Sequence, residues 1–262
     1  MGKDMLAIIA DRNLFKIAVV DYFGRGAVVG RNDIGNFINL AAVSSQSEGN
    51  RNRLYEVDEG TGSVRTDLAD PSKVKLGTPT HNIIYPAMLQ DLVKGLFVVG
   101  NGDQTKTALD NLSYRAMSLA ESLEERRHED DGDNHTSRIT GFIDIGAHPH
   151  FSISVLRRLR FPRGLTAQFT SERLSYEYDD IDPGYGFWIQ TYRGSGKPLP
   201  VYEEEPLLVP LYGSGEEILA RYRETLDNEN LVSIAVKEIT PKGEVKISVY
   251  NKYAKVEPVV VS

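Results

Sequence analysis

The stretch FVVGNGDQTKT, residues 97–107, changes abruptly from a strand pattern to a helix pattern. Its apolar, β-favouring start predicts a buried strand, which runs into six small or polar residues from Gly100 to Thr105. A plain turn needs about two such residues, so this cluster indicates that a polar group is held there. A helix N-terminus suits a phosphate or a polar heterocycle, although a simple cap and turn explains the same residues.

Two amphipathic helices are expected. The first begins at about Thr105, capped by Asp103 or Thr105 itself, because apolar residues then recur at intervals of three and four. These residues are Leu109, Leu112, Ala116, Leu119, Ala120 and Leu123. The second covers residues 215–226, with Ser214 as its cap.

The other apolar runs have the composition of strands. We expect strands at residues 5–9, 14–20, 27–30, 36–45, 81–88, 95–100, 138–146, 150–159 and 186–194. Two hairpins are predicted: one turns at residues 32–35, and the clearer one joins residues 231–240 to 244–253 through Pro241-Lys242-Gly243. Many strands linked by tight turns favour antiparallel pairing, so the pattern predicts a mixed α/β or α+β domain with large sheets.

Composition limits the classes of function. The chain has 262 residues and a net charge of −7, which argues against a broad nucleic-acid surface, because such surfaces need clustered Lys and Arg. It has no cysteine, which excludes disulfides and thiol nucleophiles. No apolar run approaches the ~20 residues of a membrane helix, and Asp4, Asp11 and Arg12 interrupt the first apolar segment. We therefore expect a cytoplasmic protein without membrane association.

Two motifs carry little weight. GRGAVVG, residues 24–30, is similar to a dinucleotide fingerprint with one extra residue, but a β-branched run replaces the helix that the fingerprint requires, so a bent strand is favoured. His148 and His150 flank a proline in an extended segment, which makes a metal pair conceivable. No carboxylate pattern completes a metal site, so none is predicted.

Two polar loops are stronger candidates for a site. SSQSEGNRNR, residues 44–53, places Arg51 and Arg53 among hydroxyl and amide donors. With Arg25 and Arg138 they form a plausible anion pocket in an acidic protein, although a plain loop is the alternative. ERRHEDDGD, residues 125–133, is either a solvated loop or a segment that turns one carboxylate inward for proton transfer.

Several blocks of the sequence resemble one family when they are taken in order. They are YFGRGAVVGRN, SSQSEGNRNR, RTDLADPSK, IIYPA, NGDQT, NHTSRITG and TYRGSGKPLPVYEEEPLLVPL. Together they resemble the inosine monophosphate (IMP) cyclohydrolase family of archaea and its bacterial relatives, over about residues 22–212. We expect a single domain over residues 1–262, with an N-terminal extension at residues 1–21 and a C-terminal helix and hairpin at residues 214–253.

The resemblance implies a fold and a reaction. The fold is the four-layer α-β-β-α sandwich of the N-terminal nucleophile hydrolases, with mostly antiparallel sheets. Autoprocessing is not expected, because the family block begins at Tyr22, which is no Ser, Thr or Cys nucleophile. The reaction is dehydrative closure of the purine ring, from a formamidoimidazole carboxamide ribonucleotide to IMP. It requires no cofactor, so none is predicted; the partner is a nucleotide substrate, and a homo-oligomer is left open.

The resemblance also assigns roles to residues. Arg51 would polarise the formyl oxygen or pair with an anionic group, Tyr85 would donate a proton or stabilise an oxyanion, and Glu129 would transfer a proton. The residues expected to bind the substrate are Arg25, Ser45, Arg53, Asn101, Gly102, Asp103, Thr105 and Arg138.

Three residues depart from the family pattern. Gln46 stands where an arginine is usual, and His135 and Ser137 replace the Tyr and Pro often seen before the arginine at position 138. Asp130 or Asp131 is an alternative to Glu129 as the acid. Two other functions stay open: a non-catalytic purine-nucleotide-binding relative, which Gln46 favours, and an amide hydrolase of the same fold.

Overall fold

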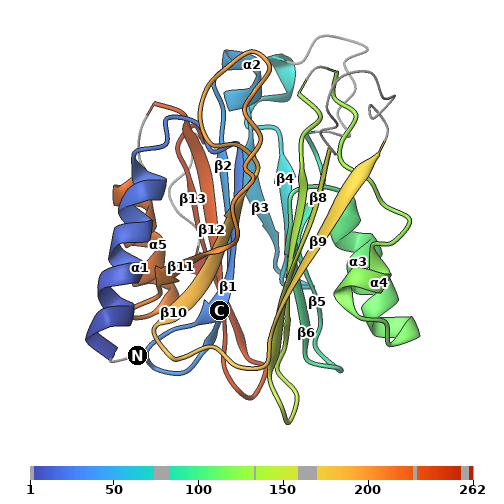
Figure 1. The fold of residues 1–262 in the computed structure, drawn as a ribbon, viewed down its shortest axis with the longest axis vertical. Coiled ribbons are helices and arrows are strands. Elements are labelled where there is room, and N and C mark those ends of the chain that lie inside the picture. The colour runs from blue at the N-terminus through green and yellow to red at the C-terminus, as the bar shows by residue number, and fades with distance from the viewer. Residues whose placement is uncertain are drawn as a thin grey trace.

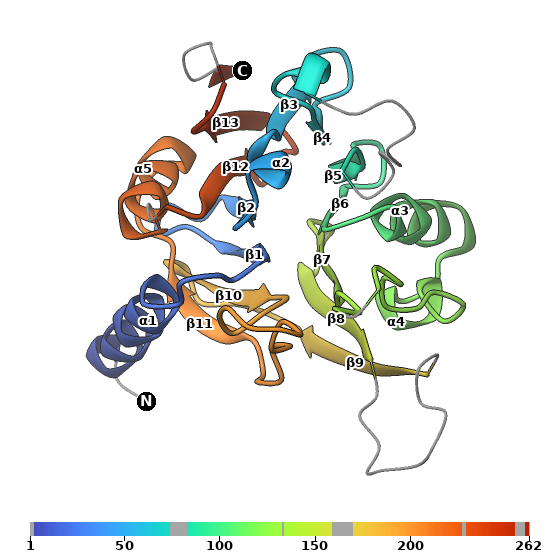
Figure 2. The ribbon, with the colours of Figure 1, turned by 90° about the horizontal axis from the view of Figure 1, so that it is seen from above.

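A computed structural model describes residues 3–73, 83–132, 134–158, 170–226, 229–254 and 260–261. Its strands form two seven-stranded sheets, and every described strand pair is antiparallel. The sheets pack face to face, with helices on both outer sides (Figures 1 and 2). The expected mixed class with antiparallel sheets is therefore confirmed.

The first sheet has the order β11-β10-β1-β2-β12-β13-β14. Its strands are β1 (Arg25–Arg31), β2 (Phe37–Ser44), β10 (Tyr185–Gln190), β11 (Leu207–Pro210), β12 (Leu231–Ile239), β13 (Val245–Asn251) and β14 (Val260–Val261). Helices α1 (Lys3–Ala18) and α5 (Gly215–Leu226) cover its outer face.

The second sheet follows chain order from β3 to β9. Its strands are β3 (Leu54–Asp58), β4 (Ser63–Asp67), β5 (Pro86–Asp91), β6 (Leu96–Gly100), β7 (Arg138–Asp144), β8 (His150–Arg158) and β9 (Ser171–Tyr178). Helices α3 (Gln104–Arg115) and α4 (Leu119–Ser122) cover its outer face. Two short elements, α2 (Glu48–Arg51) and a 3₁₀ turn (Pro71–Lys73), lie in loops.

The main apolar core fills the space between the sheets, and the sheets approach closely at Gly141. A Cβ atom added there would lie 2.6 Å from Cγ1 of Val29 in β1 and 2.9 Å from Cγ1 of Val99 in β6. Since real Cβ atoms do not come so close to a neighbour, any larger residue at position 141 would force Val29 and Val99 to move. Gly141 therefore helps to set the spacing of the two layers.

Several sequence predictions are confirmed. The terminal hairpin pairs β12 with β13 in continuous register from Ser233↔Asn251 to Ile239↔Val245. GRGAVVG forms strand β1, and residues 32–36 form its turn into β2. Ser214 caps α5 through a reciprocal pair of hydrogen bonds with Glu217, as expected for a capping box.

The strands predicted at residues 5–9 and 14–20 are wrong, because residues 3–18 form helix α1. Ala10, Leu14 and Ile17 are buried at helical spacing. Large apolar residues also occupy the exposed side of the helix, namely Met5, Ile8, Phe15 and Val19. This second apolar stripe fills the gaps in the 3.6-residue period and makes the sequence look like two strands.

The first predicted helix ends earlier than its periodicity indicates. It stops at Arg115 because Ala116 adopts a left-handed conformation with φ of 51°, and Ser118 caps the separate helix α4 through a capping box with Glu121. Asp103 occupies the N-cap of α3, but its side chain makes no capping hydrogen bond. Of the strand predicted at 81–88, residues 81 and 82 lie outside the described residues, and β5 begins at Pro86.

Among the described residues, no helix combines the length and apolar content needed to cross a bilayer.

Lys237 of β12 is buried between the sheets, which is unusual for a lysine. Its ammonium donates to Oε1 of Gln90, and burial lowers its pKa to about 7. On β2, the register partner of Lys237 is Asn39. Asn39 is also fully buried, and its amide atoms have no hydrogen-bond partner among the described residues.

We expect Lys237 to make folding stability depend on pH. Between pH 7 and 10.5 the unfolded lysine holds a proton that the folded lysine has released, so the free energy of unfolding should rise with pH there. The slope from this residue is at most about 1.4 kcal/mol per pH unit. Lys237→Met should remove that slope and stabilise the protein at neutral pH, as measured by urea unfolding at a series of pH values. The matched control is Lys242→Met in the exposed turn of the same hairpin, and an equal slope in wild type and Lys237→Met would contradict the prediction.

Candidate functional site

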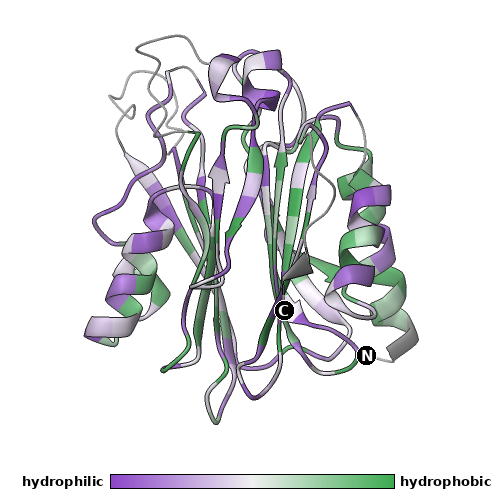
Figure 3. Ribbon diagram, turned by 180° about the vertical axis from the view of Figure 1, so that it is seen from behind, coloured by the Kyte–Doolittle hydropathy of each residue, from purple (hydrophilic) through white to green (hydrophobic). Residues whose placement is uncertain are grey.

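A pocket of about 460 Å³ lies beside the loops at one end of the sandwich. It is bounded by the loop that carries α2, by residues 128–137 and by residues 191–199, and Figure 3 shows that α2 is hydrophilic. Its lining residues are Tyr22, Arg25, Gln46, Ser47, Asn50, Arg53, Ile83, Asn101, Glu129, Asp131, Asn134, Thr136, Tyr192 and Leu199.

Arg25, the first residue of β1, links the two sheets at this pocket. Its Nε donates to the hydroxyl of Tyr85 at 3.0 Å, and Tyr85 directly precedes β5 of the second sheet. Its Nη1 donates to the carbonyls of Gly24 and Ser44 at 3.3 and 3.4 Å. Burial opposes the charge, but Tyr85 and neighbouring groups outweigh it and raise the pKa of Arg25. Arg25 is therefore a fixed cation, and Tyr85, which does not line the pocket, holds it in place.

Arg53 is a second cation of the pocket, and it is almost completely buried, with 5% of its surface exposed. Its Nη2 donates to Oδ1 of Asn50 at 3.3 Å, while Nε and Nη1 have no partner among the described residues. Burial and the nearby charge of Arg25 lower the pKa of Arg53 to about 10, so it still carries its charge at neutral pH. A buried guanidinium with open donors is suited to bind an anion.

Glu129 is the inward carboxylate of the charged segment 125–133. Its side chain is only 13% exposed and lies 3.9 Å from Nη1 of Arg138, whereas the side chain of Asp130 is 75% exposed. A hydrogen bond from the backbone N–H of Glu129 to the carbonyl of Thr136 fixes the loop. Burial raises the pKa of Glu129 against the opposing effect of Arg138 and Arg25. The segment thus has features of both interpretations: Glu129 turns inward, and Asp130 faces solvent.

The sequence predictions missed a network of hydroxyl groups beside Glu129. Asp131 accepts from the backbone N–H of Thr136 at 2.9 Å and also from its hydroxyl, which contacts the hydroxyl of Tyr192. The ring of Tyr192 stacks on Tyr22, with centroids 5.5 Å apart. Tyr22 and Tyr192 come together because they flank strands β1 and β10, which pair with each other. The sequence alone did not establish that pairing.

Arg51 and Ser45 do not line the pocket. Nε of Arg51 donates to the carbonyl of Ser45, and its Nη2 donates to Oδ1 of Asn230, both at 3.3 Å. Ser45 is buried, and its hydroxyl donates to the carbonyl of Ser47. These contacts tie the α2 loop to the segment before β12, so Arg53 supplies the guanidinium that faces the pocket from this loop.

The polar cluster after β6 is held mainly by bonds within the protein. Asn101 lines the pocket, but its Nδ2 donates to the carbonyl of Ser137 at 2.8 Å, and its Oδ1 accepts from the backbone N–H of Ile139 at 2.9 Å. The hydroxyl of Thr105 donates to the carbonyl of Gly102 at 2.8 Å. Gly102 and Thr105 do not line the pocket, so this cluster joins β6 to β7, and Asn101 is its member that lines the pocket.

Asp103 and Arg138 belong to an ion-pair group next to the pocket. Oδ1 of Asp103 lies 3.2 Å from Nη2 of Arg138, and its other oxygen pairs with Arg126. Partial burial would raise the pKa of Asp103, but these two arginines lower it overall. Arg138 also donates to Gln104, and a Cβ atom at Gly102 would lie 1.6 Å from its Nη1. Arg138 is therefore already neutralised, and it faces Glu129 from one side.

The three residues that depart from the family pattern are buried or line the pocket. Gln46 lines the pocket and donates to the hydroxyl of Ser195, which in turn donates to Asp21. His135 is buried with φ of 47°, and its ring packs edge-on against His128 at 5.5 Å. Ser137 is also buried. Gln46 thus connects two loops that border the pocket.

The fold and the pocket define an α+β protein in which two layered sheets bring paired guanidinium groups and an inward carboxylate into one small polar cavity. A family model described as IMP cyclohydrolase-like protein matches residues 22–244, which is most of the chain, and the protein belongs to that family. The match begins after α1 and continues beyond residue 212, through α5 and β12. Comparison with curated proteins gives no match.

We expect Arg53→Met to stabilise the ligand-free protein. The substitution keeps much of the side-chain volume and removes a buried charge with open donors, so the free energy of unfolding should rise by about 1–3 kcal/mol. Urea unfolding without ligand measures this change. The control is Arg51→Met, which deletes a guanidinium with two hydrogen-bond acceptors and should lower stability. A loss of stability in Arg53→Met would show that the buried charge is compensated.

Proposed function

We propose that this protein closes the purine ring, converting 5-formamidoimidazole-4-carboxamide ribonucleotide into IMP. Membership of the IMP cyclohydrolase-like family supports this proposal. The observation that carries it is the buried guanidinium of Arg53, which has open donors in the same pocket as Arg25 and the inward carboxylate of Glu129. Such a pocket offers an anion-binding group and a proton-transfer group within reach of one small molecule.

The reaction needs help at three points. The carboxamide nitrogen attacks the formyl carbon, a C–N bond forms, and the formyl oxygen becomes a hydroxyl that leaves as water. The carboxamide nitrogen loses one proton as the C–N bond forms, the formamide nitrogen loses a second as the ring C=N bond forms, and the formyl oxygen gains these two protons as its bond to carbon breaks. Holding the substrate in its reactive rotamer supplies part of the barrier reduction, at most about 7–11 kcal/mol, and one oxyanion donor supplies about 2.7–4 kcal/mol more.

The pocket residues suit these three tasks. We assign Arg53, assisted by Asn50, to an anionic group of the substrate, because its Nε and Nη1 have no other acceptor among the described residues. Glu129 is assigned to proton transfer, and Arg25, oriented by Tyr85, to the developing charge on the formyl oxygen.

The remaining predicted residues receive supporting roles. Arg51 would hold the α2 loop, and Arg138 would position Glu129. The stacked rings of Tyr22 and Tyr192 offer a flat surface for a base. We assign Asn101 to the substrate as a wall of the pocket, with Gly102, Asp103 and Thr105 behind it.

We infer that the fold is of the N-terminal nucleophile hydrolase type, used without processing. Face-to-face antiparallel sheets between outer helices support this inference. In this chain, Tyr22 follows helix α1 and is joined to Asp21 by a peptide bond. It therefore has no free amine to act as a base.

Incubation with the formylated ribonucleotide, followed by ultraviolet absorbance, tests the proposed reaction. Wild-type protein should accelerate ring closure above the spontaneous rate, and Arg53→Met should raise KM at least about tenfold. IMP binding without turnover would instead identify a non-catalytic nucleotide-binding relative. Hydrolysis of unphosphorylated amides, unaffected by Arg53→Met, would identify an amide hydrolase.

We expect Glu129→Gln to lower kcat by about a hundredfold or more, the usual contribution of a general base. Asp130→Asn is the matched control, because its neighbouring carboxylate faces solvent, and its kcat should stay close to that of wild type. Asp131→Asn tests the alternative assignment. Full activity in Glu129→Gln together with a large loss in Asp131→Asn would transfer the role to Asp131.

The dependence of kcat on pH should report Glu129 directly. As a base it works as the carboxylate, which is populated above its pKa, so the rate should fall as the pH drops through that pKa. Because burial raises this pKa above 4.5, the fall should begin at a higher pH than an exposed glutamate would give. A profile from about pH 4 to about pH 8 measures it, and an unchanged acid limb in the residual activity of Glu129→Gln would contradict the assignment.

A further inference from the structure

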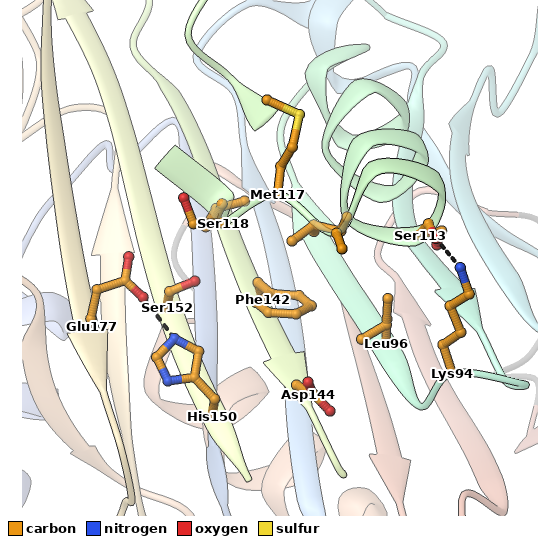
Figure 4. A pocket seen from close by; sticks show the side chains of 13 residues that line it. Lys94, Leu96, Ser113, Met117, Ser118, Phe142, Asp144, His150, Ser152 and Glu177 are labelled. Atoms are coloured by element: carbon orange, nitrogen blue, oxygen red, sulfur yellow. Dashed lines mark hydrogen bonds and ion pairs between the residues drawn. The ribbon is translucent and has the colours of Figure 1, made fainter. Parts of the chain in front are cut away.

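A second pocket, of about 620 Å³, lies between helices α3 and α4 and the outer face of the second sheet (Figure 4). It is at the far end of α3 and β7 from the candidate site, since Gln104 and Arg138 begin these elements whereas Ser113 and Asp144 lie near their ends. Its volume is within the range of small-molecule sites. None of its lining residues belongs to the candidate site.

The floor of this second pocket is apolar. Leu96 and Phe142 come from adjacent strands of the sheet, and Leu112 and Leu119 come from the helices above them. In Figure 4 the ring of Phe142 lies in the middle of the floor. These residues offer an aromatic or aliphatic body a surface on which to pack.

Two hydroxyl groups in the lining lack partners. Ser152 is fully buried beside Phe142 in the β7–β8 register, and Ser113 on α3 is 5% exposed. Within the described part of the chain, neither Oγ has a hydrogen-bond partner. Because leaving a buried hydroxyl unpaired is unfavourable, a polar group of a ligand that reached either atom would be favoured.

The charges around the pocket favour a cation. Asp144 lines it, and among the described residues only its Oδ1 is engaged, by the backbone N–H of Gly146 at 2.8 Å. Glu177 lines it as well, paired with His150 at 2.7 Å. The carbonyl groups at the C-terminal end of α3 add a partial negative charge.

Lys94 also lines the pocket, and its ammonium group contacts the end of helix α3. Its ammonium donates to the carbonyl of Ser113 in the last turn of α3, and it lies 5.7 Å from the centre of the Tyr114 ring. A lysine at a helix C-terminus stabilises the end of that helix. Among the described residues, no ion pair joins Lys94 to Asp144.

We propose that this pocket binds a small organic cation with an apolar or aromatic body. The body packs on Phe142 and the surrounding leucines, and the ammonium group is held by Asp144. This proposal is independent of the reaction assigned to the other pocket.

Three probes of similar size separate charge from shape. Phenethylamine, 2-phenylethanol and 3-phenylpropanoate are cationic, neutral and anionic at neutral pH. Titration calorimetry should give saturable binding of phenethylamine with a Kd on the order of 1 mM, as expected for so small a ligand. The alcohol should bind more weakly and the anion should not bind.

Asp144→Asn should weaken phenethylamine binding at least about tenfold, and the matched control Asp182→Asn, an exposed aspartate outside the pocket, should not. Thermal unfolding verifies that both variants fold. In wild-type protein, phenethylamine should shift the amide NMR signals of residues 113, 142 and 152, which locates the probe without any substitution. No binding at about 10 mM phenethylamine, equal binding of the anion, or signal shifts confined to other residues would overturn the proposal.

Discussion

The structure of the candidate site depends on two arginine side chains that lie near each other at one end of the sandwich. Burying a cation is unfavourable by several kcal/mol unless hydrogen bonds and opposite charges compensate it. Arg25 has that compensation from Tyr85 and from two backbone carbonyls. Among the described residues, Arg53 has one hydrogen-bond acceptor, Asn50, and burial and the charge of Arg25 lower its pKa in spite of Glu129. The ligand-free protein therefore retains an unfavourable group that an anionic ligand would relieve, a common trade between stability and function.

The rest of the site follows from this pair of charges. The segment 128–137 brings Glu129 and Asp131 to the same pocket, so that a protein with a net charge of −7 contains a local balance of cations and carboxylates. Asp103 neutralises Arg138 outside the pocket. The positive N-terminal end of helix α3 lies near the candidate site, and its negative C-terminal end borders the pocket of Asp144. The two pockets thus lie at opposite ends of the α3 dipole.

Sequence reasoning reached the elements that are determined locally. The terminal hairpin, the cap at Ser214 and the strand nature of GRGAVVG follow from turn residues, capping residues and alternation, and all were found. Helix α1 was missed because Met5, Ile8 and Phe15 are exposed and hide its period. Of the two arginines predicted in the segment 44–53, only Arg53 lines the pocket, and this choice depends on a contact between Arg51 and Asn230, about 180 residues away in the chain. No local pattern contains such a contact.

The hydrogen bond between Arg25 and Tyr85 joins one sheet to the other, and the distance between the sheets is limited at Gly141 by Val29. The candidate site is thus sensitive to residues that it never touches. A larger side chain at position 141, in the centre of the sandwich, would push the sheets apart. This would separate the guanidinium of Arg25 from the hydroxyl of Tyr85 at the edge of the sandwich. Drift in the core of this protein during evolution would consequently be constrained by ligand affinity as well as by folding.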